Sequence, residues 1–196
     1  MGIIESASRL FNLLASHNTT FTQYLKSGLP KSEIENLVEP LGITLPDEVI
    51  TFYSHYNLPK GYQFNSDQPT FFGIFWLLSL EEAVEEYKFR RLHNFFKERD
   101  NAWFPLLQED ANFYYLDVAQ ITGNICPITE GSEYTVEPET MFTSLEAMFD
   151  TMYYWIHEGA LQVVEGHIVG DYEGNRKHVA EIASRINTGV KHWESY

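Results

Sequence analysis

The chain has 196 residues, 44% hydrophobic and 15% aromatic, so it can bury a core and does not have the composition of a disordered protein. Its 28 Asp and Glu residues outnumber 13 Lys and Arg residues, which gives a formal net charge of −15. A chain this negative repels phosphates, so we expect neither nucleic acid nor an anionic membrane as a partner. Its single cysteine cannot form an internal disulfide, which fits a reducing compartment.

The N-terminal segment lacks a basic run followed by an apolar stretch, so we expect no secretory signal. No window approaches the roughly 18 apolar residues that a membrane span needs. The longest apolar run, Phe71 to Leu78, is interrupted by Gly73. We therefore expect a cytoplasmic protein.

Helical periodicity predicts three helices in the first third of the chain. Apolar residues recur at helical spacing from Ile3 to Ala15. A second helix is expected between Pro30 and Gly42, because proline suits a helix entry and glycine its end. A third helix opens at Asp47, and its buried stripe runs to Tyr56.

Strand signals dominate the middle of the chain. The apolar aromatic run from Thr70 to Leu78 is typical of a buried strand. Ser79 and Glu82 then form a capping box that begins a helix. Turn residues separate three further predicted strands, whose spacing favours an antiparallel meander: Trp103 to Leu107, Asn112 to Val118 and Asn124 to Ile128.

Helical signals return after these strands. Thr143 and Glu146 form a second capping box, followed by an amphipathic helix that ends at Gly159. The segment from Leu161 to Val169 is ambiguous, and a last helix is expected around Val179 to Ile186. The order of helices, strands and helices predicts an α+β fold rather than a doubly wound parallel sheet.

The negative charge is concentrated in one stretch. Between Asp100 and Asn175 there are 14 acidic residues and no Lys or Arg. The remainder holds 28 − 14 = 14 acidic and 13 basic residues, a net charge of −1. This stretch is either a solvated acidic face that aids solubility or a docking surface for a basic macromolecule.

Motifs for catalysis are lacking in the sequence, which holds no His-Glu-x-x-His pair, Cys-x-x-Cys, Gly-x-Ser-x-Gly elbow or glycine-rich phosphate loop. The spacing of His167, Asp171 and His178 matches no standard metal site. Cys126 lies in an apolar segment without a nearby cation, which indicates a buried, inert thiol. We therefore expect a protein that is not an enzyme and needs no cofactor or metal.

Candidate binding residues come from the acidic stretch and from strand alternation. Tyr114 and Tyr115 are adjacent on a predicted strand, so one ring should be buried and the other exposed. Asp117 shares the face of Tyr115, and an acidic loop precedes the strand. Aromatic anchors within an acidic rim suit a protein–protein hot spot. The predicted partner-binding residues are Glu109, Asp110, Tyr115, Asp117, Glu130, Glu133 and Glu137.

Three pieces of the chain form a pattern: Ser32 to Glu35 with Leu41 to Asp47, Phe52-Tyr53 and Tyr56-Asn57; Trp103 to Pro105 before Tyr114 to Asp117; and Thr143 to Phe149. Together they resemble the SUKH superfamily, which includes fungal cell-wall assembly regulators of the Smi/Knr type and many bacterial immunity proteins. The resemblance covers about Leu29 to Gly159. It leaves residues 1–28 as an N-terminal helical extension and residues 160–196 as a C-terminal extension of a single domain, 1–196.

The resemblance implies a curved antiparallel sheet of about four to six strands flanked by helices, in agreement with the α+β order. It also implies a non-enzymatic protein, because bacterial members typically neutralise a cognate toxin, often a nuclease, by binding it. We therefore expect an immunity protein with a basic toxin as partner. The alternatives are a regulatory or scaffold protein of the same fold with an endogenous partner and, more distantly, a hydrolase using Glu109 and Asp110. The sequence does not define an oligomeric state.

Overall fold

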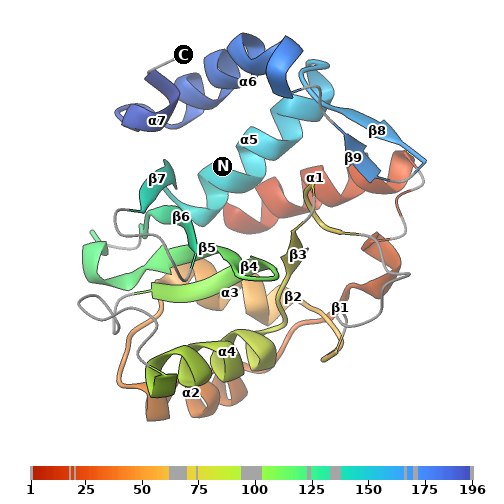
Figure 1. Cartoon of the computed structure of the whole chain (residues 1–196). Helices are drawn as coiled ribbons and strands as arrows, with labels where there is room; N and C mark the ends of the chain where they lie inside the picture. The colour runs from red at the N-terminus through yellow and green to blue at the C-terminus, as the bar shows by residue number, and fades with distance from the viewer. Residues whose placement is uncertain are drawn as a thin grey trace.

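The chain forms an α+β fold in the computed structural model, which describes residues 2–17, 19, 21–61, 70–73, 75–93, 103–122, 125–132, 138–165, 167–169 and 172–194. Figure 1 shows the elements in chain order. They are α1 (Ile3–Ser16), β1 (Lys26–Ser27), α2 (Lys31–Val38), α3 (Asp47–His55), β2 (Tyr56–Asn57), β3 (Trp76–Leu77), α4 (Leu80–His93), β4 (Trp103–Glu109), β5 (Asn112–Asp117), β6 (Ile128–Ser132), β7 (Glu139–Phe142), α5 (Leu145–His157), β8 (Gln162–Val164), β9 (His167–Val169), α6 (Tyr172–Ile186) and α7 (Lys191–Glu194).

The central sheet has five strands in the order β3-β4-β5-β6-β7, and every neighbouring pair is antiparallel. Strand order follows chain order, which is the meander that the turn spacing predicts. The pairs β1–β2 and β8–β9 form two small separate sheets. The α+β prediction and the antiparallel sheet are therefore confirmed.

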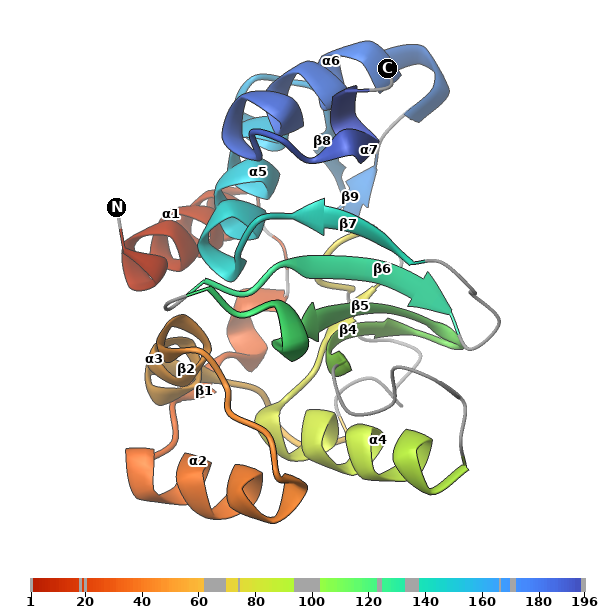
Figure 2. The ribbon, with the colours of Figure 1, turned by 90° about the vertical axis from the view of Figure 1, so that its left-hand side faces the viewer.

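Helices surround this sheet on one side and at both ends (Figure 2). In that view α1, α3 and α5 lie on one side, α4 lies beside the β4 end, and α6 and α7 lie beyond β7. Phe11 of α1 joins the two sides of the core, with ring centroids 5.8 Å from Phe149 of α5 and 5.1 Å from Tyr56. The N-terminal helix is therefore part of the same hydrophobic core as the sheet and α5.

A second, smaller cluster lies on the sheet and consists of Trp103, Phe113 and Tyr115. The Tyr115 ring stacks between the other two, with centroids 5.6 Å from Trp103 and 5.2 Å from Phe113. Arg90 of α4 places its guanidinium carbon 3.6 Å from the centre of the Phe113 ring. Since stacked rings and a flat cation exclude water, this part of the sheet is buried as well.

Two predicted helix starts have different outcomes. The capping box before α4 is confirmed, because the backbone N–H of Ser79 donates to Glu82 at 3.1 Å and the N–H of Glu82 donates to Ser79 Oγ at 3.2 Å. The second box is wrong by one residue. Ser144 caps α5 by accepting from the N–H of Ala147, and the N–H of Thr143 donates to the Asn187 side chain instead of to Glu146.

The predicted strands differ most from the structure where the chain turns sharply. Among the described residues of the Thr70 to Leu78 run, only Trp76–Leu77 joins the sheet, because Phe72 and Phe75 pair across a tight turn that includes Gly73 at φ +55°. The third strand begins at Ile128 rather than ending there. Neither β7 nor the early start of α6 at Tyr172 was predicted.

Among the described helices, none is long and apolar enough to cross a membrane.

Candidate functional site

Three polar side chains form a row across the sheet toward its β7 edge. Tyr114 of β5 pairs directly with Glu130 of β6, and Glu130 pairs directly with Glu139 of β7. Directly opposite residues in antiparallel strands project from the same face. The Tyr114 hydroxyl donates to Glu130 Oε2 at 3.2 Å. The row therefore begins at a ring packed in the main core and ends at an exposed carboxylate on the outermost strand.

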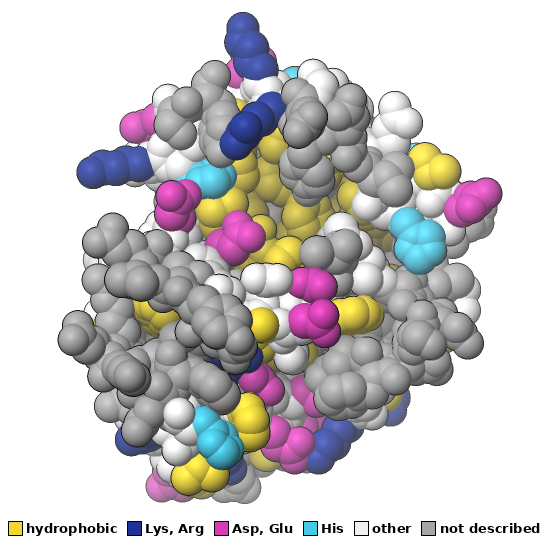
Figure 3. All heavy atoms as spheres, in the orientation of Figure 1, with side chains coloured by type: hydrophobic (Ala, Val, Ile, Leu, Met, Phe, Trp, Pro, Cys, Tyr) yellow, Lys and Arg dark blue, Asp and Glu magenta, His cyan; other side chains and the backbone are white. Residues whose placement is uncertain are grey.

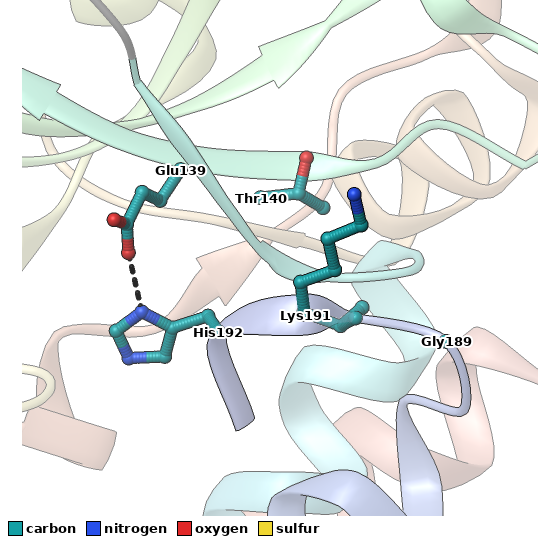
Figure 4. Close-up of a pocket in the computed structure, with 6 residues that line it drawn as sticks. Glu139, Thr140, Gly189, Lys191 and His192 are labelled. Carbon is teal, nitrogen blue, oxygen red and sulfur yellow. Dashed lines mark hydrogen bonds and ion pairs between the residues drawn. The ribbon is translucent and has the colours of Figure 1, made fainter. Parts of the chain in front are cut away.

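The C-terminal helix α7 packs against this same edge of the sheet. His192 Nδ1 lies 2.6 Å from Oε2 of Glu139, and the indole N–H of Trp193 donates to the carbonyl of Met141 at 2.5 Å. Figure 4 shows His192 and Glu139 facing one another. Because one contact uses the backbone of β7 and the other its side chain, α7 holds the strand from the side that β6 leaves open.

A pocket with a volume of about 510 Å³ lies between β7 and the segment that leads into α7. We call it the β7–α7 groove, and its lining residues are Glu139, Thr140, Gly189, Val190, Lys191 and His192. In Figure 4 the Lys191 side chain rises beside Thr140, away from the Glu139–His192 contact. The groove therefore has a carboxylate end and an ammonium end. On the face in Figure 3, acidic and histidine side chains flank a hollow with a hydrophobic floor.

The surroundings of Glu130 favour either a protonated carboxyl group or a carboxylate whose charge is balanced by a cation. Burial raises the pKa of Glu130 above its usual 4.5, and the nearby charge of Glu139 raises that pKa further. The hydrogen bond from Tyr114 and the proximity of His192 lower the pKa but do not cancel the rise. Two carboxylates directly opposite one another repel, so a cation between them would be stabilised.

Two of the sequence-predicted site residues form the tip of the β4–β5 hairpin. Asp110 is exposed and adopts φ +44°, a left-handed conformation that aspartate tolerates in a tight turn. Glu109 accepts a hydrogen bond from Asn112 Nδ2 at 2.8 Å. These two carboxylates are therefore accessible, but one is engaged in holding the turn.

The expected aromatic–acidic patch around Tyr115 is not formed. Tyr115 is fully buried and Tyr114 is only 6% exposed, so the prediction that one of these rings lies at the surface is wrong. Tyr114 packs into the main core, whereas Tyr115 on the opposite face is buried between the rings of Trp103 and Phe113. Strand alternation correctly placed the two rings on opposite faces of the sheet, but it did not predict that both faces are buried here.

Asp117 is also buried, which corrects the expectation that it lines a surface. Its carboxylate accepts from the N–H of Ala119 at 3.2 Å and from the side chain of Gln120 at 2.6 Å, so it stabilises the turn that follows β5. It lies at the opposite end of β5 from the Asp110 tip, about 17 Å from Asn112 along the strand at 3.4 Å per residue.

Of the remaining predicted site residues, Glu130 belongs to the cross-sheet row, whereas Glu133 and Glu137 lie outside the described residues. Sequence reasoning missed Glu139 as a site residue because no strand was predicted there. It also missed His192, which is 53 residues away from Glu139 along the chain. The strand register brings Glu139 to Glu130, and no local sequence signal identifies the contact of His192.

Cations from outside the acidic stretch offset part of its charge. Arg9 of α1 forms an ion pair with Asp150 at 2.8 Å, and its guanidinium carbon lies 4.2 Å from the centre of the Tyr153 ring. Arg185 of α6 pairs with Glu158 at 2.5 Å. The two extensions therefore supply positive charge to α5.

Cys126 is buried, as the sequence indicates. Burial raises the pKa of its thiol to about 12, with further increases from the charges of Asp117 and Glu48. The thiol is therefore protonated at neutral pH and is a poor nucleophile.

Within the described ranges, no three His, Cys, Asp or Glu side chains are grouped to hold a metal ion. Asp171, one of the residues considered for such a site, lies outside those ranges.

An antiparallel five-stranded meander flanked by helices, with a charged groove at its last strand, defines an α+β protein. The chain belongs to the SMI1 / KNR4 family (SUKH-1), whose model matches residues 28–158. Members of this family are generally non-catalytic. The match excludes α1 and β1 at one end and β8, β9, α6 and α7 at the other, so α7 lies outside the part of the chain that the family model covers. No curated protein matches the sequence significantly.

Proposed function

We propose that this chain is a non-enzymatic immunity protein that neutralises a basic toxin, a nuclease in particular, by binding it directly in the cytoplasm. The observation that carries this proposal is the family match over residues 28–158, because bacterial members of the superfamily typically act in this way.

The charge of the chain supports a basic partner. A nuclease must hold phosphate, so its active surface is commonly rich in Lys and Arg. The chain has a formal net charge of −15, and accessible carboxylates lie at the β4–β5 tip and on β7. Opposite charges accelerate the encounter of two proteins, which helps an inhibitor to act before damage accumulates.

The direct test is co-expression with the product of the neighbouring reading frame, followed by binding measurements with the two purified proteins. We expect the chain to rescue growth and to bind with an association rate that falls about tenfold or more from low to high salt. Failure to rescue growth and to bind that product would contradict the proposal.

A matched pair of variants separates local from general charge effects. Glu109→Gln with Asp110→Asn removes two charges at the hairpin tip, and Glu33→Gln with Glu35→Gln removes two exposed charges on α2. If the tip contributes to docking, the first variant slows association more than the second. Equal effects would show that net charge alone steers the association.

The alternative function, a regulatory or scaffold protein, predicts instead that pull-down recovers an endogenous partner and that no neighbouring toxin is neutralised.

A further inference from the structure

The β7–α7 groove has an open strand edge as one wall. β7 is last in the sheet order, with β6 as its only strand neighbour in the part of the chain that the structure describes. Trp193 closes this edge at Met141, whereas Glu139 and Thr140 line the groove beyond that contact. An open edge with unpaired backbone groups can accept an extended segment from another protein.

The charges beside this edge favour a cation. Glu130 and Glu139 are directly opposite across β6 and β7, where like charges destabilise the pairing. Lys191 lines the same groove, but no ion pair within 4.0 Å joins it to either glutamate among the described residues. His192 can balance part of the charge of Glu139 only when its imidazole ring is protonated. Glu139, which lines the groove, is therefore complementary to a positive group, and Glu130 lies directly opposite it on β6.

We propose that the β7–α7 groove binds an extended basic segment of the partner protein, with a Lys or Arg side chain of that segment placed between Glu130 and Glu139. The backbone of the segment lies along β7, and one of its carbonyls faces Lys191 at the other end of the groove. This inference rests on the proposed function for the identity of the partner. The groove itself depends on α7, which lies outside the family match.

A peptide titration tests the groove without any toxin. The probe is an acetylated and amidated peptide of alternating arginine and threonine, followed through the backbone amide signals of Thr140, Lys191 and His192. The matched control peptide carries citrulline, which has the shape of arginine without its charge. We expect the arginine peptide to shift these three signals and the citrulline peptide to leave them in place. Equal shifts with both peptides, or none with the arginine peptide, would overturn the proposal.

Variants of the two carboxylates sharpen this test. We expect the double variant Glu130→Gln with Glu139→Gln to raise the half-saturating peptide concentration about tenfold or more, because two charge-assisted contacts are lost. Glu33→Gln, which removes an exposed charge on the distant helix α2, should change it by less than about twofold. Glu139 is 69% exposed, so the single variant Glu139→Gln also tests the site with the fold intact.

The two proposals fail in different ways. If the chain rescues cells and the double variant rescues them equally well, the groove is not the docking site, although the immunity function stands. If rescue fails but the arginine peptide still binds through Glu130 and Glu139, the groove is supported and the immunity function is not.

Discussion

The carboxylate of Glu48, on α3, accepts a hydrogen bond of 3.2 Å from the backbone N–H of Leu145, the first residue of α5. Its second oxygen accepts from the N–H of Glu146, also at 3.2 Å. A negative side chain from one helix therefore satisfies the unpaired donors that begin another helix, 97 residues later. Burial raises the pKa of Glu48 despite these bonds, so the contact is made at a desolvation cost.

Removing this contact should destabilise the protein. We expect Glu48→Ala to lower the free energy of unfolding by about 2 kcal/mol, because it leaves two backbone donors of α5 without their acceptor. Urea unfolding followed by circular dichroism measures the loss. Asp47→Ala, at the exposed neighbouring position, is the control and should cost less than about 1 kcal/mol. Equal losses for the two variants would contradict a specific role for Glu48.

Gly28 marks a close approach of two backbone segments. A Cβ at this position would lie 2.1 Å from the carbonyl carbon of Ser54, and the backbone N–H of Gly28 donates to His55 O at 3.1 Å. We expect Gly28→Ala to cost about 3 kcal/mol or more, since backbone rather than a flexible side chain must move. Gly2→Ala, where a Cβ meets nothing within 4 Å, should be nearly neutral. A similar thermal midpoint for both variants would refute this interpretation.

The N-terminal extension should unfold together with the rest of the chain. Phe11 of α1 packs against rings from other parts of the fold, including Phe21 and Phe149 at 5.8 Å each. We expect Phe11→Ala to cost about 3–5 kcal/mol and to shift a single cooperative transition. Phe89→Ala is the matched control, because that ring is 49% exposed. Two separate transitions in the wild type would show that α1 does not belong to the same cooperative unit.

Stability should depend on pH through Glu130. Because its pKa in the folded state is raised above 4.5, ionisation costs folding free energy, and this cost appears as the pH rises through the raised pKa. We expect Glu130→Gln to be more stable than the wild type at pH 7. The difference should vanish below pH 4.5, where the wild-type carboxyl is protonated in both the folded and unfolded states. Urea unfolding at the two pH values checks the sign.

Glu33→Gln provides the comparison for this experiment, because it removes an exposed carboxylate from α2. Its difference from the wild type should change little between the same two pH values. A Glu130→Gln variant less stable than the wild type at pH 7 would mean that its hydrogen bond from Tyr114 outweighs the burial of its charge.

Much of the fold could be predicted because it rests on local patterns. The helical spacing from Ile3 to Ala15 and the capping box at Ser79 both correspond to observed helices. The antiparallel meander followed from short strands separated by turns. The strand at Glu139–Phe142 was missed, because four residues with little alternation become a strand only through pairing with β6.

The candidate site could be predicted only in part. Charge counting drew attention to Glu130, but alternation alone placed Tyr115 at the surface, whereas its ring is buried between Trp103 and Phe113. Alternation separates the two faces of a strand and carries no information on whether a second layer covers the other face.

The sequence by itself determined the acidity of this protein, the α+β order of most of its elements and its family pattern, since these follow from composition and from local residue patterns. Tertiary structure alone decided which carboxylates remain available. It buried Asp117, paired Asp150 with Arg9, and set Glu130 opposite Glu139 beside α7. The reason is that charge is additive along a chain, whereas its accessibility depends on strand register and on the helices that pack from distant positions.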